Sequence, residues 1–119
     1  MSLFARDSAP YTHIVYFIDA AVESAEISAW LIALESEPDH MRSIRLAEIK
    51  NGMEYNQAPE QHIQIVELMN NFDVLQAMNK VVVDVRQSGM LAGKFIRKKD
   101  PESFNLLVGL IAAAFSDKD

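Results

Sequence analysis

The sequence contains no cysteine, and only four glycines, four prolines and one tryptophan occur among its 119 residues. A chain without cysteine forms no disulfides and no thiolate metal sites. Four glycines are too few for the glycine-rich loops that bind nucleotide phosphates, and no such motif is present. The longest apolar run, Leu106 to Phe115, is about half the ~20 residues that a membrane-spanning helix requires.

Basic residues are also few, because 11 lysines and arginines stand against 17 acidic residues, which gives a net charge of −6. A negative surface disfavours nucleic acids and anionic membranes as partners. The first ten residues lack the apolar core of a signal peptide. We therefore expect a soluble cytoplasmic protein that has neither nucleic acid nor membrane as a partner.

The composition is that of an ordinary folded protein. Half of the residues are hydrophobic and 24% are charged. A chain of this length can bury a core without disulfides or metals. We interpret residues 1–10 as a mobile leader and residues 11–119 as a single domain.

The segment from Tyr11 to Asp19 is rich in β-branched and aromatic residues, which favours a strand. Both of its alternating faces are apolar, so we expect a strand that is covered on both sides. Ser24 is the expected N-cap of a helix that runs to about Glu35 and is closed by Pro38. Apolar residues recur at helical spacing along this second segment: Ile27, Trp30, Leu31 and Leu34.

The segment from Asp39 to Lys50 fits two structures. Its apolar residues suit a strand over Ser43–Lys50, and they also suit a short helix. Asn51-Gly52 favours the strand, because Asn-Gly is the preferred two-residue turn of a β-hairpin. Glycine also ends helices, so the pair does not exclude the helix. We predict the strand and the hairpin.

The rest of the chain predicts a strand, a helix, a second strand and a last helix: His62–Met69, Asp73–Gly89, Met90–Lys98 and Phe104–Phe115. Asp100 and Pro101 mark the start of the last helix, since aspartate caps helices and proline favours the first helical position. This helix is apolar nearly all round, which indicates burial or a subunit interface. The fold class is therefore α+β, a ferredoxin-like βαββαβ arrangement with an extra C-terminal helix.

Two motifs resemble the dimeric α+β barrel superfamily, especially its stress-responsive branch. The segment from His13 to Phe17 matches a first strand of the form His-Ile-Val-x-Phe, and His62-Ile63 matches the start of a third strand. The resemblance covers about Tyr11 to Met78. It implies that two ferredoxin-like subunits join their sheets into a barrel, and that each subunit holds a small pocket. Known members include polyketide cyclases and cofactor-free monooxygenases, so no cofactor is expected.

The resemblance also carries one catalytic residue to this chain, because the first-strand histidine of the cyclases matches His13. The second cyclase motif, His-Pro-x-His at the end of the helix after the third strand, is not matched. Asn79-Lys80-Val81-Val82 stands in that region instead.

His13 and His62 are the foremost catalytic candidates. The first and third strands of a ferredoxin-like sheet are neighbours, so two imidazoles at their starts would lie side by side and could transfer protons near neutral pH. Glu67 is a third candidate, because apolar neighbours raise the pKa of a carboxyl group. Alternatively, both histidines are half-exposed strand ends without a task, and Glu67 faces water.

Tyr16 and Trp30 are candidate ligand-binding residues, since aromatic side chains line small-molecule pockets, although core packing also accounts for both. No metal site is expected, because the two histidines have no third ligand at a recognisable spacing. We interpret the remaining clustered cations as surface charges: Arg42, Arg45, Lys94, Arg97, Lys98 and Lys99.

Two classes of function follow. In the first, a homodimer binds a small aromatic or polyketide-like ligand, with or without catalysis by His13 as a base on an acidic C–H or phenol. In the second, a noncatalytic homodimer binds a protein through its apolar C-terminal helix. A homodimer is expected because the first strand and this helix present more apolar surface than one small domain covers.

Overall fold

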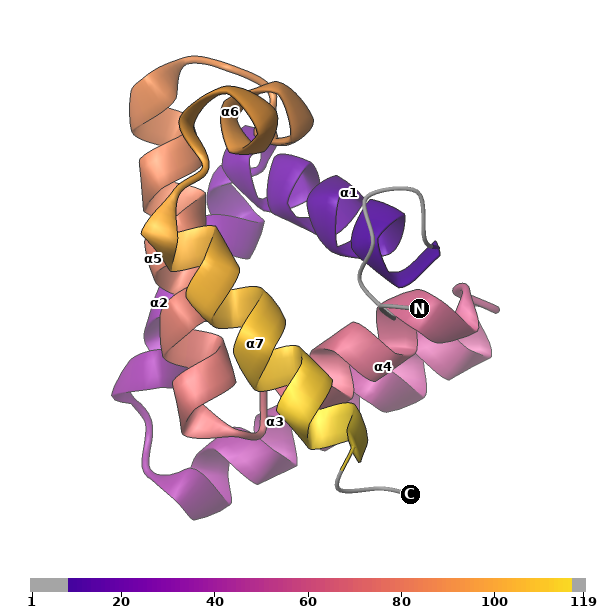
Figure 1. Cartoon of the computed structure of the whole chain (residues 1–119). Coiled ribbons are helices and arrows are strands. Elements are labelled where there is room, and N and C mark those ends of the chain that lie inside the picture. The colour runs from indigo at the N-terminus through magenta and orange to yellow at the C-terminus, as the bar shows by residue number, and fades with distance from the viewer. Residues whose placement is uncertain (1–8, 117–119) are drawn as a thin grey trace.

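The computed structural model describes residues 9–116, and in this range the chain forms seven helices and no strand (Figure 1). The helices are α1 (Ala9–Glu23), α2 (Ala25–Ser36), α3 (Asp39–Tyr55), α4 (Glu60–Leu68), α5 (Phe72–Ser88), α6 (Ala92–Lys99) and α7 (Glu102–Ser116). The predicted α+β ferredoxin-like fold is therefore wrong, and so is the resemblance to the dimeric barrel. Of the predicted leader, residues 1–8 lie outside the described range, and residues 9 and 10 begin α1.

The predicted first strand is part of helix α1. Its fully buried side chains are Ile14, Ile18 and Ala21, and their spacing of four and three residues defines one face of a helix. Tyr16, which a strand would place beside Ile14 and Ile18, is 66% exposed. Isoleucine, valine and aromatic residues lose at most about 0.7 kcal/mol each in a helix, a cost that burial of this face outweighs.

The second predicted strand and its hairpin are also wrong, because a single helix, α3, spans Asp39–Tyr55. The helical alternative for this segment is the observed one. Arg42 and Leu46, four residues apart, are its buried residues. Asn51 and Gly52 lie inside the helix, and a side chain at Gly52 would meet open space, so no turn requires the glycine there.

The third and fourth predicted strands are the short helices α4 and α6. The apolar run of α4 is buried on more than one side: Ile63, Ile65, Val66 and Leu68. Helix α6 is sharply amphipathic, since Ala92 and Ile96 are buried while its lysines and arginine are exposed. A β-branched or amphipathic run of eight or nine residues suits either structure, and here packing selects the helix.

The three predicted helices are confirmed as α2, α5 and α7. The Ser24 hydroxyl caps α2 by accepting a hydrogen bond of 3.2 Å from the Ile27 amide, as predicted. The Asn71 side chain caps α5 by accepting hydrogen bonds from the Asp73 and Val74 amides. Gly89 ends α5 with a φ of 70°, a left-handed conformation that glycine adopts without strain.

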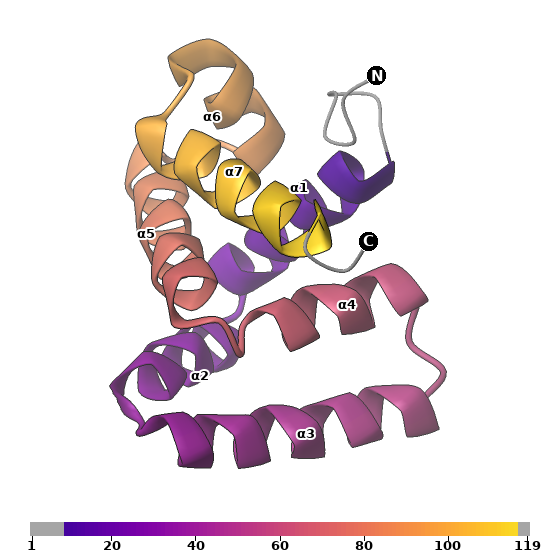
Figure 2. The same cartoon turned by 60° about the horizontal axis from the view of Figure 1, so that its bottom comes forward.

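Helix α5 packs against four other helices, α1, α2, α6 and α7 (Figure 1). It contributes a long buried face: Val74, Leu75, Ala77, Met78, Val81, Val82 and Val85. Helices α3 and α4 lie side by side as a hairpin, which joins the rest of the molecule through α2 and α1 (Figure 2). The candidate site lies between this hairpin and the pair α1–α2.

Polar groups tie the helices together at their ends. The Asp19 carboxylate on α1 accepts a hydrogen bond of 2.8 Å from the Ala92 amide, because Leu91 at the start of α6 has no side-chain acceptor. The buried Ser28 hydroxyl donates to the Ala21 carbonyl and accepts from Arg86, which links α1, α2 and α5.

None of the helices in the described range is both long and apolar enough to cross a bilayer.

Candidate functional site

A cavity of about 410 Å³ opens between the pair α1–α2 and the hairpin α3–α4. Its volume falls within the range of about 300–1,000 Å³ that is common for small-molecule sites. All four helices line it: α1 with Phe17, α2 with Glu26, Ile27 and Trp30, α3 with Ile49 and Met53, and α4 with Val66. We call this cavity the apolar pocket.

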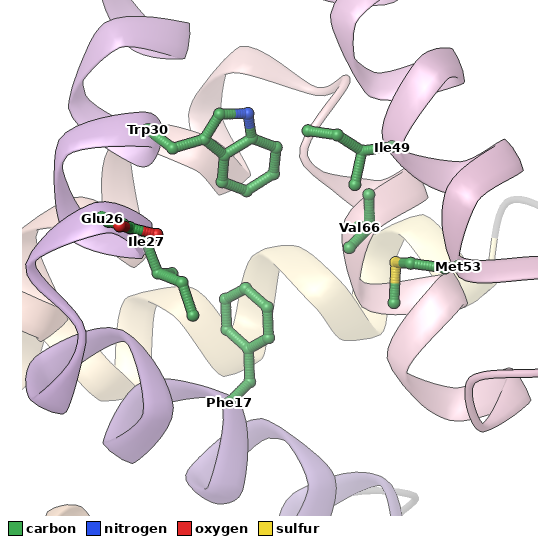
Figure 3. A pocket seen from close by; sticks show the side chains of 7 residues that line it. All are labelled: Phe17, Glu26, Ile27, Trp30, Ile49, Met53 and Val66. Atoms are coloured by element: carbon green, nitrogen blue, oxygen red, sulfur yellow. The ribbon is translucent and has the colours of Figure 1, made fainter. Parts of the chain in front are cut away.

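Figure 3 shows how the side chains surround the centre of the pocket. Trp30 lies above and Phe17 below, and the other residues close the two sides. Phe17, Trp30 and Ile49 are half-buried, so they contact the core and also present surface to the cavity. The pocket is therefore apolar, with two aromatic walls.

Helical periodicity places these residues. Phe17 lies one turn before Ala21 on α1, beside the buried face of that helix. Ile49 and Met53 are four residues apart on α3 and so share one face. Ile27 and Trp30 belong to the apolar stripe of α2 whose deeper members, Leu31 and Leu34, fill the core.

The histidines predicted as a pair are close together, although helices rather than strands bring them there. His13 Nδ1 on α1 and His62 Nε2 on α4 are 3.1 Å apart, and the ring centroids are 5.0 Å apart at an interplanar angle of 75°. One imidazole donates its N–H to the other, and the tautomers decide the direction. Tyr16 stacks on His62 with a centroid distance of 5.9 Å and an angle of 7°.

The histidine pair is chemically suited to proton exchange, but it does not line the apolar pocket. Each histidine lies one helical turn before a pocket residue, His13 before Phe17 and His62 before Val66. The pair therefore joins α1 to α4 beside the pocket. Tyr16 belongs to this cluster, whereas Trp30 is a wall of the pocket itself.

Burial lowers the pKa of His62 below its ordinary value of 6.5, and the neighbouring His13 lowers it further, because a second positive charge is unfavourable there. The folded protein therefore favours the neutral imidazole of His62 more than the unfolded chain does. Among the described residues no acid or base besides His13 has such an effect on His62.

We expect the free energy of unfolding to fall as the pH decreases from about 6.5 towards the lowered pKa of His62. In that window the unfolded chain binds more protons than the folded chain, so acid favours unfolding. Well above pH 6.5 His62 is neutral in both the folded and the unfolded chain, so its titration no longer lowers the free energy of unfolding. Urea unfolding over a pH series measures the slope, which His62→Phe should flatten while keeping an aromatic ring beside Tyr16.

His40, exposed in the first turn of α3, provides the matched control for this pH series. His40→Gln should leave the slope unchanged. An unaltered slope in His62→Phe would mean that other groups cause the loss of stability in acid.

Glu67 lies apart from the histidine pair. Its Oε1 atom is 2.8 Å from Lys50 Nζ on α3, and this hydrogen bond and charge raise the pKa of the Lys50 ammonium. Glu67 and Lys50 line a separate cavity of about 210 Å³ between α3 and α4. Glu67 thus joins two helices through an ion pair, and the structure does not unite the three predicted catalytic residues.

No group of three histidine, aspartate or glutamate side chains within residues 9–116 is arranged to hold a metal ion. The histidine pair consequently offers two nitrogen ligands, fewer than the three or four protein ligands of common zinc sites.

The sequence indicates little of the pocket: of its two candidate ligand-binding residues, Tyr16 and Trp30, only Trp30 lines the cavity. The signal was present in α1 and α3, where Phe17 lies between Ile14 and Ile18 and where Ile49 and Met53 are four residues apart. A strand interpretation of both segments concealed it.

Comparisons with protein-family models, with curated proteins and with solved structures each found no match.

Proposed function

We propose that this protein binds a small, ring-containing apolar molecule in the apolar pocket, without chemical conversion. The observation that carries the proposal is the lining of a 410 Å³ cavity by six apolar side chains from four helices. Two of them, Trp30 and Phe17, are aromatic, and aromatic side chains pack well against a planar ring. Burial of such a ligand removes apolar surface from water on both partners.

Binding rather than catalysis is proposed because the His13–His62 pair lies beside the pocket and, of the described residues, neither histidine nor Glu67 lines its wall. The idea of a polyketide-like ligand came from the barrel resemblance, which the helical fold removes. An aromatic or aliphatic ring system is what the walls themselves favour.

The homodimer expected from the sequence stays a prediction. Its first reason, a strand with two apolar faces, no longer holds, because α1 buries one face in its own domain. Its second reason survives in part, since Leu106 on α7 is 55% exposed. Leu106 and Leu110 also line a surface cavity between α5 and α7.

Naphthalenemethanol, a neutral two-ring probe, should bind the protein saturably at one site. Trp30 is the single tryptophan, so its indole N–H gives one resonance that reports directly on the pocket. We expect this resonance to shift on titration, with a calorimetric stoichiometry of one probe per chain. Ile49→Arg should weaken binding by about tenfold or more, because it places a charge and a long side chain in an apolar wall.

Ile44→Arg is the matched control, since Ile44 lies on the same helix but is 50% exposed and outside the pocket. Circular dichroism checks that both variants fold. A wild-type protein whose Trp30 resonance does not move with the probe would contradict the proposal. Equal affinity of Ile49→Arg and wild type would contradict it as well, because the probe would then bind elsewhere.

A further inference from the structure

The pocket has one charged feature in an otherwise apolar lining. Of the described residues that line it, only Glu26 is charged, and the lining contains no lysine, arginine or histidine. Glu26 is exposed, so its carboxylate lies at the solvent-facing edge of the cavity, next to Ile27 (Figure 3). A ligand with a positive group at that edge would meet an opposite charge, and a ligand with a negative group would meet a like charge.

Glu26 is also available for such an interaction. Within residues 9–116 the ion pairs join Arg42 to Asp39, Arg45 to Glu37 and Lys50 to Glu67, and no cation is paired with Glu26. Its carboxylate therefore has no described partner that a ligand would have to displace.

The aromatic walls point to the same charge. The face of an indole or benzene ring carries partial negative charge and attracts cations, and tryptophan does so most strongly. Trp30 and Phe17 lie on opposite sides of the pocket centre (Figure 3). Trp30 is on α2, the helix that also carries Glu26, and Phe17 is on the neighbouring helix α1. Glu26 and Trp30 are four residues apart on α2, so an ammonium group near the carboxylate would also lie near the indole ring.

The charge of the whole chain adds to this local preference. A net charge of −6 concentrates cations near the surface and repels anions. The largest cluster of basic residues is on α6, a helix that contributes nothing to the pocket lining.

We infer that the ligand is a protonated amine carried on an apolar, ring-containing body, with the ammonium group at Glu26 and the ring between Trp30 and Phe17. This inference rests on the proposed function, because it names the chemical class of molecule that the pocket binds.

Glu26 also lies in the first turn of α2, where an acidic side chain stabilises a helix through its dipole. That role requires no ligand. The test therefore compares the affinities of probes that differ in charge. If Glu26 had only a structural role, its substitution would change all of these affinities equally.

The experiment uses three probes with one ring system: naphthylmethylamine, naphthalenemethanol and naphthylacetate, which are cationic, neutral and anionic near neutral pH. Calorimetry and the Trp30 indole resonance measure binding to the wild-type chain. We expect the amine to bind most tightly and the acetate most weakly. Glu26→Gln should weaken the amine by about two- to fivefold, as for a partly exposed ion pair, and leave the alcohol unchanged. Raising the salt concentration should reduce the affinity of the amine alone.

Glu23→Gln is the matched control, because Glu23 is an exposed acid at the end of α1 that does not line the pocket. It changes the net charge equally and should leave all three affinities unaltered. If the amine and the alcohol bind equally, or if Glu26→Gln weakens all probes alike, the inference is overturned while the proposed function stands. If none of the probes binds, the proposed function itself fails.

Discussion

Replacing Ile18 with alanine is expected to lower the free energy of unfolding by about 2–5 kcal/mol, since truncation of a buried isoleucine leaves a cavity in a close-packed core. Ile18 is fully buried on α1, the helix that contacts α2, α4, α5 and α6. Urea unfolding followed by circular dichroism measures the change.

Tyr16→Ala is the control that separates a helix from a strand over this segment. Tyr16 is two residues from Ile18 and 66% exposed, and its main contact is the stacking on His62. We expect its loss to cost less than about 1 kcal/mol, as is usual for exposed positions. In a strand, Tyr16 and Ile18 would share one buried face, so two similarly large losses would contradict the helical structure.

The helices that could be predicted from the sequence are those with specific end signals. Ser24 caps α2 and Gly89 ends α5, tasks that few other residues perform, and Pro101 directly precedes α7. The apolar residues of α5 also repeat over about three turns, a length at which helical and strand periodicities differ clearly.

The helices that were mistaken for strands lack these signals. The run from Ile14 to Ile18 is aliphatic or aromatic at every position, so it satisfies both a period of two and a period of 3.6. Only β-propensity then favours the strand, and it is a weak term compared with burial. The hairpin turn expected at Asn51-Gly52 is a similar case. The turn propensity of this pair is weaker than the helical preference of the segments on either side, which form one continuous helix.

In the candidate site, the contact between the two histidines was predicted from the sequence, but the apolar pocket was not. The proximity of His13 and His62 was expected for a reason that does not apply, namely adjacent parallel strands. It arises because α1 and α4 pack against each other and bring the two histidines into contact. The apolar pocket depends on the relative placement of four helices, and no local pattern in the sequence contains that information.

Arg42 illustrates the same limit for a charged residue. It was interpreted as a surface ion-pair partner, but its side chain is 3% exposed. The guanidinium pairs with Asp39, donates to the Glu37 carbonyl at 3.2 Å and lies 5.3 Å from the centroid of the Phe72 ring. One side chain thus joins the end of α2, the first turn of α3 and the start of α5.

We expect Arg42→Ala to lower the free energy of unfolding by about 2–4 kcal/mol, because it removes a charged hydrogen bond, a cation–π contact and the buried aliphatic stem together. Arg42→Met retains most of the aliphatic stem and should lower the free energy of unfolding by less. The difference between the two variants gives the contribution of the packed stem, and the loss that remains in Arg42→Met gives that of the polar contacts. Arg45→Ala is the matched control on α3: its ion pair with Glu37 is half exposed and should contribute less than about 1 kcal/mol. Chemical unfolding of the three variants gives these values, and equal small losses in Arg42→Ala and Arg45→Ala would show that the junction of α2, α3 and α5 does not depend on the buried guanidinium.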